Sequence, residues 1–227
     1  MLDLGVLVTL WRNPAAMGFY STHVFPRVLD WSLSDATVEE QRRAALAPLR
    51  GRVLEVGFGT GLNLACYPNT VTRLTAIDSV RMLPDRVAKR ISEAHMPIEL
   101  FLLDASGTLP FEDRSFDGVV TTFTLCSIRD VLSALAEIRR VLKPDHPFAF
   151  LEHGRSDDPR VIKWQDRLNP IQRVVACGCN LNRPIESLIR RSGFEIVKIE
   201  RYLMPGVPRI FAEMYRGLAR PAEGLAQ

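Results

Sequence analysis

The stretch from Val53 to Gly61 constrains the fold more than any other, because an apolar run leads into closely spaced glycines. It reads Val-Leu-Glu-Val-Gly-Phe-Gly-Thr-Gly, with three glycines at alternate positions. Glycine adopts backbone conformations that other residues avoid, and it lets a ligand approach the main chain. The stretch therefore predicts a buried strand, a tight turn and the start of a helix, with a ligand lying against the turn.

Composition and length indicate one ordinary globular domain. The 227 residues are 47% hydrophobic and 24% charged, and no repeat or linker divides them, so residues 1–227 are expected to form a single α/β domain. A net charge of +3 without a long basic run gives no reason to expect a nucleic-acid partner. The four cysteines lack paired metal-ligand spacings, so we expect no metal, and reduced thiols are typical of a cytoplasmic protein.

The N-terminal stretch is predicted to cover a site rather than to cross a membrane. Its first eleven residues are apolar, but they are too few to span a bilayer and lack the basic start of a signal peptide. We therefore expect no transmembrane segment. Lys and Arg are also missing from the polar side of these eleven residues, which favours a lid or a buried first turn over a membrane-surface contact. Residues 1–37 are accordingly assigned to an N-terminal lid segment.

Apolar runs and helical patterns alternate along the rest of the chain, which is typical of a mostly parallel sheet with right-handed crossovers. The last two runs have no helix between them and should pair antiparallel. We predict a three-layer, doubly wound, mostly parallel seven-stranded sheet with the last strand antiparallel. The polar stretch 154–183 breaks the rhythm, either as an ordered insertion or as a lid. The expected strands are 52–56, 71–77, 98–103, 116–122, 148–151, 194–202 and 211–219, and the expected helices 38–49, one starting at 62–66, 81–94, 131–142 and 184–192.

Polar residues recur where the apolar runs stop. Parallel strands end at one edge of a sheet, and ligands bind at that edge. A dinucleotide site would use similar residues, but Gly-x-Gly-x-Gly lacks the longer last step of Gly-x-Gly-x-x-Gly. Glu55 would also repel a pyrophosphate and attract an ammonium group. In chain order the residues at these strand ends are Glu55 with Gly57, Gly59 and Gly61, then Asp78, Asp104, Thr121 with Thr122, and His153.

Five motifs resemble those of class I S-adenosylmethionine-dependent methyltransferases. They are Glu55-Val-Gly-Phe-Gly-Thr-Gly61, Asp78, Leu103-Asp104-Ala105, the run from Leu109-Pro-Phe111 to Ser115-Phe-Asp117, and Leu142-Lys143-Pro144. The resemblance implies S-adenosyl-L-methionine as cofactor, with Glu55 on the methionine ammonium, Asp78 on the ribose, and Asp104 with Ala105 on the adenine. Ser79, Met82, Thr121 and Thr122 complete the expected cofactor site.

A narrower set of motifs resembles the methyltransferase-like branch that includes small-thiol S-methyltransferases. The motifs are Thr124-Leu-Cys-Ser127, Leu151-Glu-His153, Trp164, Cys179-Asn-Leu181 and Tyr215-Arg-Gly217. The resemblance implies a small-molecule acceptor, with methylation of a thiol as the first expectation. We also expect stretch 154–183, which breaks the rhythm of strands and helices, to form an insertion over the acceptor pocket.

His153 is the first candidate for a base or a thiolate-orienting group, because it follows a strand end and imidazole titrates near neutrality. Tyr20 and His23 are further catalytic candidates, because the N-terminal segment in this fold often covers the acceptor. Other interpretations stay open. They are N-, O- or C-methylation of a lipid, quinone or amine, a nucleotide-binding oxidoreductase, and a cofactor-binding protein without catalysis.

Overall fold

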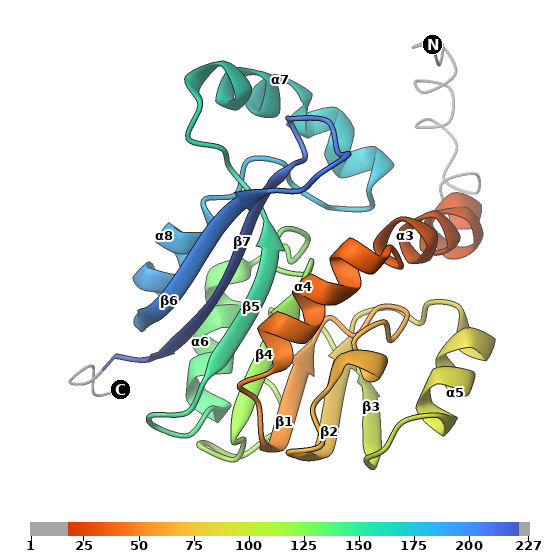
Figure 1. Cartoon of the computed structure of the whole chain (residues 1–227), viewed down its shortest axis with the longest axis vertical. Helices are drawn as coiled ribbons and strands as arrows, with labels where there is room; N and C mark the ends of the chain where they lie inside the picture. The colour runs from red at the N-terminus through yellow and green to blue at the C-terminus, as the bar shows by residue number, and fades with distance from the viewer. Residues whose placement is uncertain (1–17, 223–227) are drawn as a thin grey trace.

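The computed structural model describes residues 18–222, which form a seven-stranded sheet with helices on both faces (Figure 1). The strands are β1 (Gly51–Val56), β2 (Val71–Asp78), β3 (Ile98–Leu102), β4 (Gly118–Thr122), β5 (Phe148–His153), β6 (Phe194–Leu203) and β7 (Glu213–Pro221). The helices are η1 (Tyr20–Val24), α3 (Phe25–Leu33), α4 (Ala36–Leu46), η2 (Leu64–Cys66), α5 (Pro84–Ser92), α6 (Val131–Val141), α7 (Pro159–Val175) and α8 (Ile185–Arg191).

The sheet order is β3-β2-β1-β4-β5-β7-β6. Strands β1 to β5 pair in parallel, whereas β7 runs antiparallel to both β5 and β6. The predicted α/β class, the seven strands and the antiparallel last strand are therefore confirmed. The ends of the predicted strands and of the main helices differ from the observed ones by about one to three residues, which is the usual disagreement at element ends.

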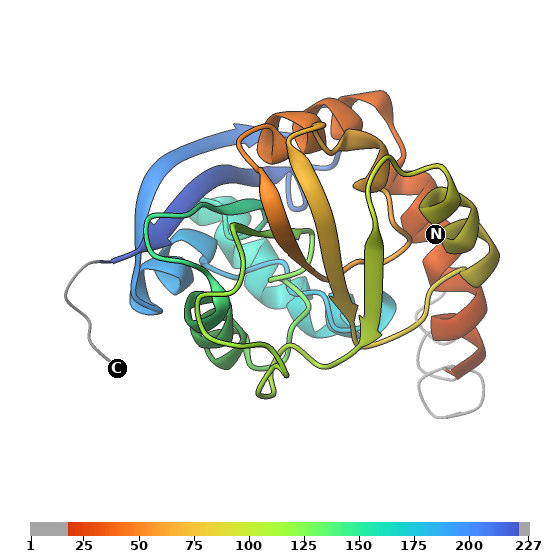
Figure 2. The ribbon, with the colours of Figure 1, turned by 90° about the horizontal axis from the view of Figure 1, so that it is seen from below.

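Both faces of the central strands are buried, as their apolar runs require. Leu54 of β1 packs in a cluster with residues of α6 and α8, while its neighbour Val53 packs in a second cluster with Leu46 of α4. Figure 2 shows the sheet between these two helical layers. Because alternate side chains of a strand point to opposite faces, one short run serves both cores.

The helix expected to start at 62–66 is a single 3-10 turn, η2, so that prediction is wrong. Proline disfavours helical backbone in the residue before it, and Pro68 follows Tyr67, whose φ of −66° and ψ of 136° are extended. The crossover from β1 to β2 is therefore mostly loop.

Stretch 154–183 is an ordered insertion that contains the 17-residue helix α7, which the sequence pattern did not predict. The carboxylate of Asp158 caps the helix by accepting from the amide of Arg160, and Pro159 occupies the first turn, where a missing N–H costs nothing. Figure 1 shows α7 beyond the carboxyl ends of the parallel strands.

The N-terminal helices η1, α3 and α4 lead to the sheet, and α4 begins at Ala36 rather than at residue 38 because Asp35 caps it. The buried carboxylate of Asp30 ties α3 to α5, through bonds of 2.6 Å to Arg90 and 2.5 Å to Arg86. The apolar stretch 1–11 lies outside the described residues. None of the helices within residues 18–222 is long and apolar enough to cross a bilayer.

Candidate active site

A cavity of about 1090 Å³ lies at the carboxyl ends of the strands. Its walls come from the glycine loop, the ends of β2, β4 and β5, the helices α3 and α4, and the segment that follows α7. The position agrees with the rule that ligands bind at the carboxyl edge of a parallel sheet. Ten of the predicted site residues line this cavity: Glu55, Gly57, Gly59, Asp78, Ser79, Met82, Asp104, Ala105, Thr122 and His153.

Four predicted residues are not among the described residues that line the cavity: Gly61, Thr121, Tyr20 and His23. Thr121 alternates with Thr122 along β4 and so faces the other side of the sheet. The hydroxyl of Tyr20 donates instead to the carbonyl of Val175 at 2.8 Å. His23 is exposed, with its ring 4.9 Å from that of Phe19. Catalytic roles for Tyr20 and His23 stay predictions, and the geometry gives them no support.

The glycine loop presents bare backbone to the cavity. A Cβ at Gly57, where φ is +84°, would lie 2.1 Å from Oγ1 of Thr124, so only glycine fits there. A Cβ at Gly59 would meet no atom of the described residues within 4 Å, so this position faces open space. The Gly59 amide donates to Oδ2 of Asp78 at 2.7 Å, which fixes the loop against the end of β2.

Glu55 lines the cavity, but both of its carboxylate oxygens are already held by protein donors. Oε1 accepts from Nδ2 of Asn63 at 2.8 Å, and Oε2 accepts from the Tyr67 hydroxyl at 2.7 Å. The side chain is 1% exposed, and burial raises its pKa from the ordinary 4.5 to about 7. The sequence predicted the position of this carboxylate but not its buried hydrogen-bond network.

Arg42 of α4 is a site residue that the sequence interpretation missed. Its Nη1 donates to Oδ1 of Asn63 at 2.7 Å and to Oγ1 of Thr122 at 2.9 Å, while its buried Nε has no hydrogen-bond partner among residues 18–222. A signal existed in the sequence, because Val38, Arg42 and Leu46 share one helix face at spacings of four. A charged residue within an apolar helix face indicates a buried polar role.

The two other acids are oriented by backbone amides. Asp78 accepts from Gly59 through one oxygen and from the Val80 amide through the other, at 3.0 Å, and burial raises the pKa of its carboxyl group. Asp104 accepts from the Ser106 amide at 2.9 Å. A carboxylate oxygen accepts more than one hydrogen bond, so both residues keep acceptor capacity toward the cavity.

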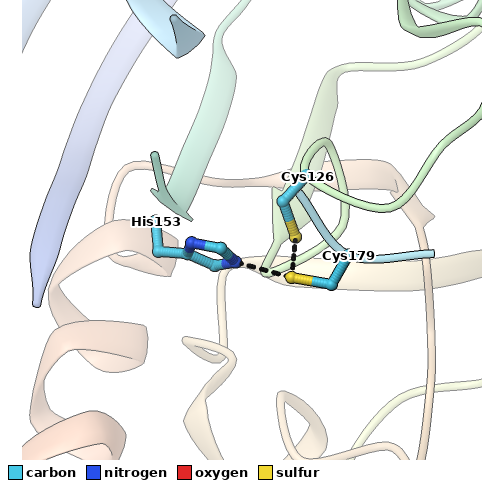
Figure 3. Close-up of side chains that lie close together, drawn as sticks. All are labelled: Cys126, His153 and Cys179. Carbon is cyan, nitrogen blue, oxygen red and sulfur yellow. Dashed lines mark hydrogen bonds between the residues drawn. The ribbon is translucent and has the colours of Figure 1, made fainter. Parts of the chain in front are cut away.

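His153, Cys179 and Cys126 meet on another part of the cavity wall (Figure 3). Nε2 of His153 lies 2.9 Å from Sγ of Cys179, which lies 3.6 Å from Sγ of Cys126. The hydrogen bond that the Cys179 thiol donates to Cys126, together with burial, raises the pKa of Cys179 and favours its neutral form. The sequence singled out His153 but did not predict that two thiols would lie beside it.

Comparisons with known proteins place these features in context. The family described as "Methyltransferase domain" matches residues 54–150. The thiol S-methyltransferase TMT1A of Homo sapiens is 34% identical over 156 residues, which cover 67% of this chain and 64% of that protein. TMT1B of Rattus norvegicus is 31% identical over 151 residues, covering 65% and 62%. These matches therefore span less than two thirds of the length of either relative.

Solved structures share the fold. The 1,6-didemethyltoxoflavin-N1-methyltransferase of Burkholderia thailandensis, with bound 1,6-didemethyltoxoflavin and S-adenosylhomocysteine, aligns at a TM-score of 0.63 and 19% identity. The alignment covers 98% of this chain and 92% of that chain. The YcgJ protein of Bacillus subtilis aligns at a TM-score of 0.60 and 17% identity, covering 82% of this chain and 97% of that chain.

Proposed function

We propose that this chain, which belongs to the class I S-adenosylmethionine-dependent methyltransferases, transfers a methyl group to the thiol of a small, rather apolar molecule. One observation carries the proposal. A single cavity is lined both by the glycine loop with its acids and by the sulfur and imidazole groups of Cys126, His153 and Cys179. The name of the human relative, a thiol S-methyltransferase, supports the same acceptor class.

The cofactor end of the cavity fits S-adenosylmethionine, which supplies an electrophilic methyl group on a positively charged sulfur. The methionine part of this cofactor carries a carboxylate and an ammonium group. Arg42, with its unpartnered Nε, suits the carboxylate, and Glu55 suits the ammonium. Asp78 has the acceptor capacity that two ribose hydroxyls need, and the open face of Gly59 allows close approach. These assignments are our proposal for the cofactor-binding residues.

The acceptor end supports an apolar thiol. The cavity lining includes apolar side chains, among them Leu29, Met204 and Phe211. A thiol has a reference pKa of roughly 8.5, so it ionises more readily than an alcohol and needs less help from a base. We assign His153 the role of orienting the acceptor sulfur. The remaining task of the protein is to align the acceptor with the methyl group and to exclude water.

The two covering segments belong to the same proposal. The described part of residues 1–37 lines the cavity with Phe25 and Leu29, and residues 154–183 line it with Ala176 and Cys179. The hydroxyl of Tyr20 joins these two segments through Val175. We propose that together they form the cover of the acceptor pocket in a single methyltransferase domain.

A transfer experiment tests the proposal. The protein is incubated with methyl-labelled S-adenosylmethionine and a panel of thiols, amines, phenols and lipids, and transferred label is counted in each product. We expect label on apolar thiols. Label on amines, quinones or lipids alone would replace the thiol by the alternative acceptors, and failure to bind the cofactor in calorimetry would overturn the site assignment.

A further inference from the structure

Three metal-ligating side chains meet at the cavity wall. Sγ of Cys126, Nε2 of His153 and Sγ of Cys179 belong to a group whose ligand atoms all lie within 4.8 Å of one another. They come from the loop after β4, the end of β5 and the loop after α7, so the fold and not a local motif brings them together (Figure 3). All three residues line the cavity.

The distance between the two sulfurs is close to an edge of a tetrahedral zinc site, whereas the Nε2–Sγ distance is shorter than such an edge. Zinc binds thiolate sulfur at about 2.3 Å and imidazole nitrogen at about 2.0–2.1 Å, so tetrahedral ligation places two sulfurs about 3.8 Å apart and a sulfur and a nitrogen about 3.6 Å apart. The observed Sγ–Sγ distance is 3.6 Å. The Nε2–Sγ distance of 2.9 Å would have to widen by about 0.7 Å when zinc binds.

The loops that carry the two cysteines are held to each other. The backbone and side-chain amides of Asn180 both donate to the carbonyl of Cys126, at 3.0 and 2.8 Å. The guanidinium of Arg183 donates to the carbonyls of Leu125 and Ile128, on either side of Cys126. This arrangement fixes the positions of the two loops that carry the sulfurs.

We propose that Cys126, His153 and Cys179 bind a zinc ion, and that its fourth coordination position faces the cavity and takes the sulfur of the acceptor. Two thiolates and a neutral imidazole suit zinc, and three protein ligands with one open position are the pattern of catalytic rather than structural zinc sites. Two thiolates also balance the charge of the ion within a largely buried site. The second half of this inference rests on the proposed function, whereas the metal site itself does not.

The ion gives the transfer a balanced course. The acceptor R–SH binds zinc as R–S⁻ and releases its proton to solvent. A sulfur lone pair then forms a bond to the methyl carbon while the bond from that carbon to the cofactor sulfur breaks, with its electron pair remaining on the cofactor. The products are the thioether R–S–CH₃ and S-adenosylhomocysteine. A neutral thioether is a weaker zinc ligand than a thiolate, which frees the fourth position for the next acceptor.

Metal content tests the site without any turnover. The full chain is reduced, stripped with a chelator, reloaded with Zn²⁺, dialysed and analysed by mass spectrometry for zinc per chain. We expect one zinc in the wild type, and a loss of zinc affinity of more than about 100-fold in Cys179→Ser and His153→Gln. Mutating a residue that only hydrogen-bonds a zinc ligand already lowers metal affinity about 10–100-fold. Cys177→Ser is the matched control, because Cys177 lines the same cavity two residues away and lies outside the cluster.

Circular dichroism and cofactor calorimetry establish that each variant is folded. Zinc binding that is equal in all four proteins would overturn the site. A wild type that takes up no zinc under reducing conditions would also overturn it. The same holds if Cys126 and Cys179 form a disulfide, with Sγ atoms about 2.05 Å apart, in place of binding metal.

Cobalt substitution tests the open position. Co²⁺ replaces zinc, and its visible spectrum is recorded while thiophenol is added, with phenol as the matched control. We expect thiophenol to change the spectrum and phenol to leave it unaltered. An unchanged spectrum with thiophenol would overturn acceptor ligation. Zinc binding without methylation of any thiol would overturn the proposed function and leave the metal site standing. Thiol methylation by the zinc-free protein would overturn acceptor ligation by zinc and leave the proposed function standing.

Discussion

Replacing Glu55 by Gln should make the protein more stable at pH 8 while weakening its hold on the cofactor. The wild-type carboxyl group is buried with Asn63 and Tyr67, near the charges of Arg42 and Asp78, and its pKa is raised to about 7. Gln keeps the shape and both hydrogen bonds, because its amide oxygen accepts from Asn63 and its NH₂ group donates to the Tyr67 hydroxyl oxygen. The substitution therefore removes the titration and little else.

The sign and size of the expected change in unfolding free energy follow from the pKa values of Glu55 in the unfolded and the folded state. The unfolded chain releases this proton near pH 4.5 and the folded protein near pH 7, so the folded state holds the extra proton between these values. The stability from the protonated form is complete below pH 4.5 and is lost as the pH rises through 7. The full loss is about 3 kcal/mol, and the part of it that falls between pH 5 and pH 8 is about 2.5 kcal/mol.

Urea unfolding at pH 5 and pH 8 measures this difference. The unfolding free energy of Glu55→Gln minus that of the wild type should rise by about 2.5 kcal/mol between the two pH values. Glu99→Gln on β3 is the control, because this exposed side chain forms a surface ion pair with Arg73 worth less than about 1 kcal/mol. An unfolding free energy of Glu55→Gln that differs from that of the wild type by the same amount at both pH values would refute the argument.

Cofactor affinity gives the second readout of the same variant. If Glu55 binds the methionine ammonium, loss of its charge removes a charge-assisted hydrogen bond worth about 1.5–3 kcal/mol. The dissociation constant measured by calorimetry should then rise about 10- to 100-fold. Unchanged affinity would contradict the ammonium assignment but would leave the stability argument intact.

Three further substitutions test other parts of the site. Gly57→Ala should lower the unfolding free energy by about 3 kcal/mol, because its Cβ meets Thr124 at 2.1 Å and its φ is +84°; unaltered urea unfolding would argue against a rigid loop. Asp30→Asn should cost about 2 kcal/mol and speed amide exchange in α3, because it weakens the bonds to Arg90; exchange as slow as in the wild type would show that this link is dispensable. Asp78→Asn should weaken S-adenosylmethionine binding about 10- to 100-fold in calorimetry, and equal affinity would remove this residue from the ribose site.

The central strands of the sheet were predictable because each is short, apolar and buried on both faces. Val53 and Leu54 enter different cores, so the unbroken apolar run before the glycines could only suit a covered strand. The carboxyl ends of the strands then follow from where these runs stop. This is why Glu55 and Asp78 could be placed at one cavity from the sequence.

Helices with little apolar surface were not predictable in the same way. Helix α7 buries only Val161 and Gln165 among its own residues, and Trp164 is 53% exposed, so no apolar stripe marks it. Pro170 inside the helix adds a further signal against helix. In η2 the opposite error arose, because an apolar pattern suggested a helix that Pro68 cuts short.

The chemistry of the site was predictable only where it depends on local motifs. His153 is 26 residues from Cys179, and Cys179 is 53 residues from Cys126, so no spacing rule for metal ligands connects them. Their meeting depends on β4 and β5 being neighbours and on the return of the chain after α7. Arg42 was missed for a different reason, because the helix that carries it precedes the motif region.

The position of β7 has a consequence for how the protein is made. This strand is the last of the seven along the chain, yet it lies inside the sheet, between β5 and β6. During synthesis the β5 edge that leads to His153 therefore stays open until residues 213–221 leave the ribosome, and β6 has no neighbour in the sheet before then. An open strand edge invites pairing with other chains, so nascent chains interrupted before β7 should be the form most prone to aggregate and most dependent on chaperones.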